Sequence, residues 1–142
     1  MNTVKLVAVF AENRPGQAAR ITEILARANI NIRCITVASS GTYGVMKLLV
    51  SDPELACRAL IDQGFAATLI DVIAVEMPDK PGALHSVARC LAARDINLCN
   101  TSGFVANNRA ILVIEVQDPS LAGEALKNEG LHVLTQQETL TI

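Results

Sequence analysis

Two tetrapeptides of this sequence have the composition of a small-anion site: Asn13-Arg14-Pro15-Gly16 and Asp79-Lys80-Pro81-Gly82. Each follows an apolar run and precedes an amphipathic stretch, which is typical of a strand–turn–helix junction. Proline is tolerated there because the first N–H groups of a helix have no partner inside it, and glycine permits a tight turn. The N–H groups left over can bind a carboxylate. The alternative is that each tetrapeptide only starts a helix, with Asn13 as its cap.

No other residue pattern favours catalysis or metal binding. The two histidines, His85 and His132, lie far apart and lack carboxylate partners at ligand spacing, so we expect no metal site. His85 follows the second Pro-Gly pair by three residues and could line that loop. The sequence has no Ser/His/Asp or Cys/His arrangement, no phosphate-binding glycine-rich loop and no paired carboxylates at a plausible cleft position. We therefore expect a protein that is not an enzyme and that carries no cofactor.

Composition excludes several classes of protein. The four cysteines form no C-x-x-C pair and are interpreted as small buried side chains in a reducing compartment: they are Cys34, Cys57, Cys90 and Cys99. No apolar run approaches the roughly 20 residues that a membrane-spanning helix needs, and the first ten residues do not resemble a signal peptide. A net charge of −2 and the lack of tryptophan argue against nucleic-acid binding. We expect a cytoplasmic protein that binds neither nucleic acid nor membranes.

The two tetrapeptides belong to an internal repeat with a shift of 66 positions, from residue 13 to residue 79. The same shift carries Ile30-Asn31 onto Ile96-Asn97, Asp52-Pro53 onto Asp118-Pro119, and Gly64 onto Gly130. Proline and glycine mark specific backbone conformations, so a single register kept over these landmarks indicates two copies of one unit.

Each copy reads as strand, helix, strand, strand, helix, strand. In the first copy the apolar pattern predicts strands over residues 4–10, 31–38, 45–50 and 65–70 and a first helix over 18–28. In the second copy it predicts a strand over 70–75, a helix over 84–91 and a closing strand over 131–135. The second helix of each copy begins at Asp52-Pro53 or Asp118-Pro119 and ends before Gly64 or Gly130. Residues 41–44 and Asn107-Asn108 supply the hairpin turns.

This order predicts an α+β protein of two ferredoxin-like βαββαβ units, each a four-stranded antiparallel sheet with two helices on one face. The units are expected at residues 1–70 and 71–142. Neither glycine nor proline interrupts residues 65–77, so the last strand of the first unit is expected to run almost directly into the first strand of the second. Whether strands are exchanged between the units stays open. Open sheet edges are usually paired with another sheet or chain, and we therefore expect a homodimer.

A βαββαβ unit of this size with a D/N-R/K-P-G turn after its first strand resembles the ACT domain. The segments I-N-I at 30–32 and I-N-L at 96–98 match the opening of that domain's second strand. The resemblance covers nearly the whole chain, twice, and is to the small stand-alone tandem ACT proteins that carry no enzyme domain. It implies a regulatory module that binds a small ligand, typically an amino acid, where two domains meet. The loop after the first strand then holds the ligand's charged end, and the start of the second strand contributes as well.

The first unit resembles, more narrowly, the serine-binding regulatory domain of phosphoglycerate dehydrogenase, whose pattern is roughly H-E-N-R-P-G followed by V-N-I. Residues 12–16 and 30–32 fit this pattern at the same spacing, but Ala11 stands in the place of the histidine. The loss of that hydrogen-bond partner argues against serine itself, because discriminating a hydroxyl needs a partner for it. In the second unit Met77 takes the same place, and Asp79 would repel a carboxylate beside it. The first unit is therefore expected to be the better amino-acid site.

The resemblance implies one set of ligand-binding residues in each unit. They are Asn13, Arg14, Pro15, Gly16, Gln17, Ala18 and Asn31 in the first unit, and Asp79, Gly82, Ala83, Leu84 and Asn97 in the second. In the first unit Asn13 and Asn31 are expected to contact the ligand, while N–H groups near residues 16–18 receive its carboxylate. Without the resemblance, Asn31 and Asn97 are simply turn residues before a strand.

Two functions follow, and the sequence leaves both open. One is a dimeric, non-enzymatic amino-acid sensor that passes ligand occupancy to a partner protein, which requires coupling between the ligand and quaternary state. The other is a dissociable regulatory subunit of an amino-acid biosynthetic enzyme, in the manner of the acetolactate synthase small subunit. Such a subunit would carry an exposed apolar patch for its catalytic chain.

Overall fold

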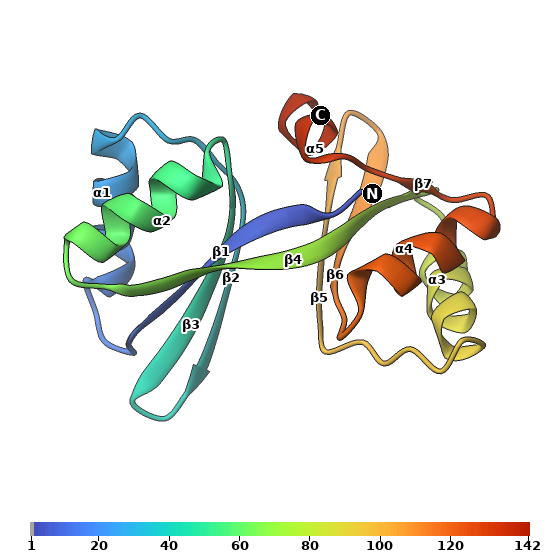
Figure 1. The fold of residues 1–142 in the computed structure, drawn as a ribbon, viewed down its shortest axis with the longest axis horizontal. Coiled ribbons are helices and arrows are strands. Elements are labelled where there is room, and N and C mark those ends of the chain that lie inside the picture. Colours follow the sequence, from blue (N-terminus) through green and yellow to red (C-terminus); the bar gives the residue numbers. More distant parts are fainter. Residues whose placement is uncertain (1) are drawn as a thin grey trace. The chain divides into compact units, whose positions relative to one another are not determined.

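The computed structural model describes residues 2–142, which divide into two compact units. The N-terminal unit comprises Lys5–Ile70, and the C-terminal unit comprises Asp71–Ile142 together with residues 2–4. Each unit contains the predicted order of strand, helix, strand, strand, helix, strand (Figure 1). The α+β class with two ferredoxin-like units is therefore confirmed.

The N-terminal unit is built on an antiparallel sheet with strand order β2-β3-β1-β4, in which β2 is an edge strand. Its elements are β1 (Val4–Glu12), α1 (Gln17–Arg27), β2 (Ile32–Ser40), β3 (Tyr43–Val50), α2 (Pro53–Asp62) and the first part of β4 (Ala66–Met77). Both helices lie on one face of this sheet (Figure 1). The strand β4 runs through the boundary between the two units without interruption, as the lack of glycine and proline in residues 65–77 predicts.

The core of the N-terminal unit follows from the alternation of side chains along its strands. Val7 and Val9 of β1 and Leu48 of β3 point toward the helices and are fully buried in one cluster with Ile21 and Leu25 of α1. Burying a side chain of this size contributes about 1.5–3 kcal/mol each. The amphipathic pattern of α1 thus fixes which of its faces meets the sheet.

The C-terminal unit repeats this arrangement with strand order β5-β6-β4-β7. Its further elements are α3 (Ala83–Ala92), β5 (Asn100–Ala106), β6 (Arg109–Glu115), α4 (Pro119–Asn128), β7 (His132–Val133) and α5 (Gln136–Thr141). The second helix of each unit begins as predicted, because Asp52 and Asp118 accept hydrogen bonds of 3.1 Å from the N–H groups of Leu55 and Leu121. Each ends at a glycine with positive φ, Gly64 or Gly130.

The closing strand of the C-terminal unit differs from the prediction. Residues 131–135 were expected to form a strand, but the strand comprises only His132–Val133. The N–H of Leu134 still donates a 2.8 Å hydrogen bond to the carbonyl of Ala74 in β4, and the chain then turns into α5. A capping box starts this helix: Thr135 accepts a hydrogen bond from the N–H of Glu138, whose carboxylate accepts one from the N–H of Thr135. The sequence signal was present, since T-x-x-E is the pattern of such a box.

The start of the chain completes the C-terminal unit. The side-chain amide of Asn2 donates a 2.9 Å hydrogen bond to the carbonyl of Val133 in β7. The two units are therefore not strictly consecutive segments, because residues 2–4 belong with the second of them. Within residues 2–142, no helix combines the length and the apolar character needed to cross a bilayer.

The cysteines do not share one environment. Cys90 is buried and its thiol lies 3.5 Å from the carbonyl oxygen of Ala125, in line with its interpretation as a small core residue. Burial raises the pKa of this thiol above its usual value. Cys34 and Cys57 are partly exposed, and Cys99 is exposed. For Cys99 the expectation of a buried side chain is wrong, because it lies in the loop just before the edge strand β5.

Candidate ligand-binding site

The first Pro-Gly loop joins β1 to α1 in the N-terminal unit. Gly16 is the N-cap residue of α1 and has φ of 91°, a left-handed conformation that glycine adopts without the penalty other residues incur. No side chain caps this helix. The expectation that Asn13 caps α1 is therefore wrong: the glycine turn places Asn13 too early in the loop to reach the first helical turn.

Asn13 instead connects the loop by hydrogen bonds to the turn between β2 and β3. Its N–H donates a 2.7 Å hydrogen bond to the carbonyl of Thr42, and its side-chain amide donates one of 3.3 Å to the carbonyl of Gly41. These contacts use the backbone N–H and one N–H of the side-chain amide, and they leave the side-chain oxygen of Asn13 as an exposed acceptor. The sequence identified residues 41–44 only as a turn and gave no sign of this role.

The first turn of α1 keeps donors available beside Asn13. The N–H of Gln17 makes a long, 3.4 Å hydrogen bond to the carbonyl of Arg14. In the described part of the chain, no acceptor is found for the N–H groups of Ala18 and Ala19, as is usual for a first helical turn. Together with the positive end of the helix dipole, these donors form a place where a carboxylate can bind.

A small pocket of about 90 Å³ lies beside this loop, entirely within the N-terminal unit. Its rim carries the polar residues Glu12, Asn13, Arg14 and Gln17. Its apolar lining includes Ala11, Ile21, Val37 and Met46. At the rim the guanidinium Nε of Arg14 lies 3.3 Å from the carboxylate of Glu12. The pocket therefore combines polar groups at its mouth with an apolar interior.

The structure places Asn31 at the other end of β2. Its N–H donates a 3.0 Å hydrogen bond to the hydroxyl of Ser51, and its carbonyl accepts one of 2.9 Å from the N–H of Ser51. Asn13 is held at Gly41, beyond the opposite end of the nine-residue strand. At about 3.3 Å per residue the two asparagines are roughly 30 Å apart. One unit therefore does not bring Asn13 and Asn31 to the same ligand.

The second Pro-Gly loop has the same backbone conformation. Gly82 is the N-cap of α3 with φ of 88°, and the N–H of Ala83 bonds to the carbonyl of Lys80 at 3.2 Å. Asp79 is exposed at the position that Asn13 takes in the first loop. The side chains around the loop differ between the two units even though the turn is conserved.

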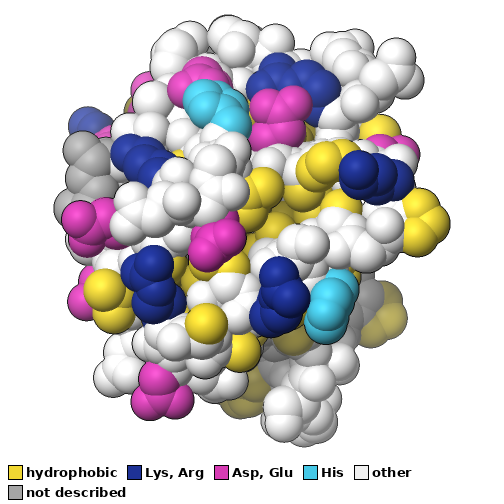
Figure 2. Space-filling view, turned by 90° about the vertical axis from the view of Figure 1, so that its right-hand side faces the viewer, with side chains coloured by type: hydrophobic (Ala, Val, Ile, Leu, Met, Phe, Trp, Pro, Cys, Tyr) yellow, Lys and Arg dark blue, Asp and Glu magenta, His cyan; other side chains and the backbone are white. Residues whose placement is uncertain are grey.

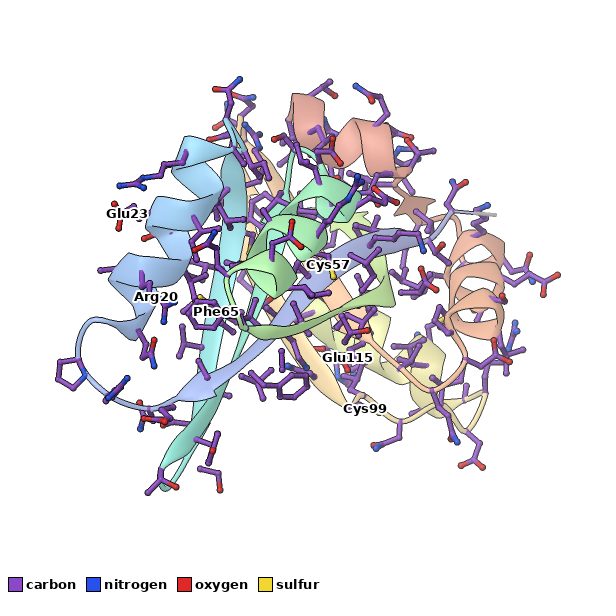
Figure 3. The ribbon with its side chains drawn as sticks, turned by 60° about the vertical axis from the view of Figure 1, so that its left-hand side comes forward. Arg20, Glu23, Cys57, Phe65, Cys99 and Glu115 are labelled. Atoms are coloured by element: carbon purple, nitrogen blue, oxygen red, sulfur yellow. The ribbon has the colours of Figure 1, made fainter. Side chains whose placement is uncertain are left out.

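Asn97 lies apart from this second loop, near the start of β5. It lines an open hollow of about 600 Å³ in the C-terminal unit together with Asp95, Cys99 and Asp118. Asp118 is already the cap of α4. The backbone N–H of Cys99 pairs with the carbonyl of Glu115, and both residues are labelled in Figure 3. As in the first unit, the two residues expected to contact a ligand, here Asp79 and Asn97, lie at separate places.

The ion pairs of the C-terminal unit lie outside both loops. Arg109 donates two hydrogen bonds, of 2.7 and 2.8 Å, to the carboxylate of Glu76, and these lower the pKa of Glu76 below its usual value against the opposing effect of burial. His132 is hydrogen-bonded to Glu138 and lowers the pKa of that carboxyl group. Basic and acidic side chains are interspersed on the face drawn in Figure 2. Among residues 2–142, no three His, Cys, Asp or Glu side chains form a metal site.

A groove between α1 and α2 is a second concavity of the N-terminal unit. It has a volume of about 420 Å³ and is lined by charges of both signs, including Arg20, Glu23 and Asp62. Arg20 is already engaged: its guanidinium stacks 4.9 Å from the ring centre of Phe65 and donates a hydrogen bond to the carbonyl of Gln63 (Figure 3). These contacts tie α1 to the end of α2, and we interpret them as structural.

Comparison with known proteins identifies relatives of the whole chain. A family model described as an ACT domain pair matches residues 2–142. The crystal structure of protein BT0572 from Bacteroides thetaiotaomicron has 31% sequence identity and a TM-score of 0.93, over 99% of this chain and 97% of that one. No curated protein sequence matches the chain.

More distant solved structures share the fold. The regulatory subunit of aspartate kinase from Thermus thermophilus has 17% identity and a TM-score of 0.63, over 90% of this chain and 93% of that one. A structure of aspartokinase alpha and beta subunits has 20% identity and a TM-score of 0.57, over 90% and 96%. The narrower resemblance of the first unit to the serine-binding domain of phosphoglycerate dehydrogenase stays a prediction.

Proposed function

Since this chain belongs to the family of ACT domain pairs, we propose that it is a non-enzymatic regulatory protein that binds an amino acid between the ACT units of two chains. The observation that supports this most strongly is the separation of Asn13 and Asn31 at opposite ends of the edge strand β2. A ligand that contacts both asparagines needs one from each of two units.

Antiparallel pairing of β2 with β2 of a second copy satisfies this requirement. Such pairing sets the end of one strand beside the start of the other, so that Asn13 of one chain lies near Asn31 of its partner, twice in each dimer. The outer edge of β2 carries backbone groups suited to this pairing. Its side chains include Ile35 and Val37, which are 46% and 62% exposed and would be covered in a dimer.

The proposed ligand contacts use the groups around the first loop. The N–H groups of Ala18 and Ala19 receive the carboxylate, and the side-chain oxygen of Asn13 accepts a hydrogen bond from the ammonium group. Arg14, Pro15, Gly16 and Gln17 form the loop around it, and Asn31 of the second chain closes the site. In the second unit the corresponding residues are Asp79, Gly82, Ala83, Leu84 and Asn97, and the carboxylate of Asp79 makes this the weaker site for an amino acid.

A thermal-shift screen against the twenty amino acids at millimolar concentration tests this function. A ligand that binds only the folded protein adds about 2.7 kcal/mol of stability at a hundred times its dissociation constant. We expect a response to a small group of amino acids, and a change of sedimentation coefficient on adding the same ligands. If none of the twenty amino acids raised the melting temperature, the proposal of a free-standing sensor would be contradicted.

The alternative function is a dissociable regulatory subunit of an amino-acid biosynthetic enzyme. It is supported by the extent of the fold match, since the aspartate kinase regulatory subunit is covered over 93% of its length. Such a subunit would form its ligand site only together with the catalytic chain. Ligand binding by the isolated protein therefore distinguishes the sensor from the subunit.

A further inference from the structure

The interior of the pocket beside the first loop is apolar. Its apolar lining includes Ala11, Ile21 and Met46, together with Val37, which is 62% exposed. Of these four, Ile21 is fully buried and Met46 is 6% exposed, so this part of the wall belongs to the hydrophobic core. A ligand group that enters the pocket meets hydrocarbon and finds no partner there for a hydroxyl or a charge.

The internal repeat explains why this pocket exists. The 66-residue shift that aligns the two Pro-Gly loops places Met77 at the position of Ala11 and Leu84 at the position of Ala18. Met77 packs against the core of the C-terminal unit, as Ala11 does against the core of the N-terminal unit. The fold therefore accepts a large side chain at this position in the C-terminal unit, where the first unit has alanine. Other lining positions change in the opposite direction, since Gly103, Val87 and Ala83 stand at the positions of Val37, Ile21 and Gln17.

The volume of the pocket limits what can enter it. At about 90 Å³ it is smaller than the cavity of roughly 150 Å³ that accommodates a benzene ring in an engineered protein core. A side chain of one to three carbon atoms fits such a space, whereas an aromatic ring needs a larger one. The apolar wall and this volume together describe a small aliphatic group.

We infer that the N-terminal unit is selective for an amino acid with a small aliphatic side chain, of the alanine to valine class, and that Met77 closes the corresponding space in the C-terminal unit. This inference rests on the proposed function and adds the class of ligand to it. The aliphatic side chain enters the pocket while the charged end of the amino acid stays at the loop. Ala11 and Ala18 are thus specificity-determining residues.

Isothermal titration of the intact protein with a graded set of amino acids tests the inference. The series glycine, alanine and valine measures how much affinity each added carbon atom contributes. Phenylalanine tests the upper size limit of the pocket. Valine and threonine have side chains of nearly equal shape, so their comparison measures the effect of a hydroxyl group. We expect affinity to rise from glycine to valine and phenylalanine not to bind. Threonine should bind about ten- to a hundred-fold more weakly than valine, the range for an apolar pocket that receives a hydroxyl. Equal or tighter binding of serine or threonine would overturn the inference.

Exchange of residues between the repeats provides matched variants. Ala11→Met fills the pocket with the side chain found at residue 77 and should weaken valine binding at least about ten-fold, the value of a lost contact of one methylene or more. Ala18→Leu makes the second exchange at an exposed helical position, where leucine is well tolerated, and keeps the test valid if Ala11→Met fails to fold. Ile61→Ala, at an exposed position of α2 outside the pocket, is the control and should leave valine affinity unchanged. An unchanged affinity in both Ala11→Met and Ala18→Leu would contradict the inference.

The outcomes separate this inference from the function on which it rests. If no amino acid binds, the proposed sensor function fails. If a polar or charged amino acid binds and Asn13→Ala abolishes the binding, the function stands and only the aliphatic selectivity is wrong.

Discussion

The side-chain amide of Asn13 donates a hydrogen bond to the carbonyl of Gly41, which lies 28 positions later in the sequence. This contact joins the loop after the first strand to the turn at the far end of β2, the edge strand of the N-terminal unit. It therefore sets the place of the loop relative to the edge at which we propose a second chain to dock. The loop at which we propose ligand binding and the edge at which we propose dimerisation are therefore connected.

Alanine substitutions in the two Pro-Gly loops should have similar effects on stability but different effects on ligand binding. A Cβ atom at Gly16 or Gly82 would meet no atom within 4 Å, so Gly16→Ala and Gly82→Ala should act only through the backbone, with φ of 91° and 88°. A left-handed conformation costs a non-glycine residue about 1–2 kcal/mol. We expect urea unfolding to show similar losses for both variants and titration to show weaker ligand binding for Gly16→Ala alone. Equal effects of both variants on binding would contradict the assignment of the site to the first unit.

The repeat also provides a pair of equivalent core positions. Leu25 in α1 and Leu91 in α3 are related by the 66-residue shift, and they are 0% and 1% exposed. Truncation of a fully buried leucine to alanine costs about 2–5 kcal/mol. We expect both Leu25→Ala and Leu91→Ala to lower the free energy of unfolding in urea by amounts in this range. Leu121→Ala, at a position 44% exposed, is the control and should change it by less than about 1 kcal/mol.

The Glu76–Arg109 pair predicts a loss of stability in acid. Because Arg109 favours the charged carboxylate, the folded protein holds the proton of Glu76 less tightly than the unfolded chain, and the pKa of Glu76 lies below 4.5 when folded. The contribution of the Glu76–Arg109 pair to the free energy of unfolding is therefore complete well above pH 4.5. It is lost as the pH falls through the folded pKa of Glu76. Because both side chains are partly exposed, the ion pair stabilises the fold by at most about 1 kcal/mol.

Urea unfolding of Glu76→Gln as a function of pH measures this contribution. The variant should be less stable than the natural chain at pH 7, and the two stability curves should converge as the pH falls below the folded pKa of Glu76. Curves that stay parallel across this range would show that the pair does not contribute. Glu23→Gln, from an exposed pair with Arg27, is the control and should follow the natural chain.

Much of the fold could be predicted from the sequence because its signals are local. The Asp-Pro starts and glycine ends of α2 and α4 are read directly from residue types, and each acts through its own backbone neighbours. The short helix α5 carried an equally local signal in Thr135 and Glu138, which the expectation of a longer closing strand obscured. Periodicity alone does not show where a strand of two residues stops.

The site could be predicted only in part because its geometry depends on distant segments. The position of the first loop follows from Pro15 and Gly16, but the bond from Asn13 to Gly41 depends on how the β2–β3 hairpin folds back. The pocket needs Val37 and Met46, which periodicity identifies only as strand residues. The roughly 30 Å between Asn13 and Asn31 is a property of strand direction, which the sequence pattern alone does not display.

The most direct test of a ligand site shared between two chains is a binding measurement on mixed variants. Asn13→Ala and Asn31→Ala are prepared separately, each is shown to have lost ligand binding, and the two are then unfolded together and refolded. If each site takes Asn13 from one chain and Asn31 from the other, a mixed dimer regains one intact site. With random pairing, about one site in four is restored. Titration should therefore give the natural affinity at about a quarter of the natural stoichiometry. No recovery of binding would contradict the shared site, and with it the proposed arrangement of the sensor.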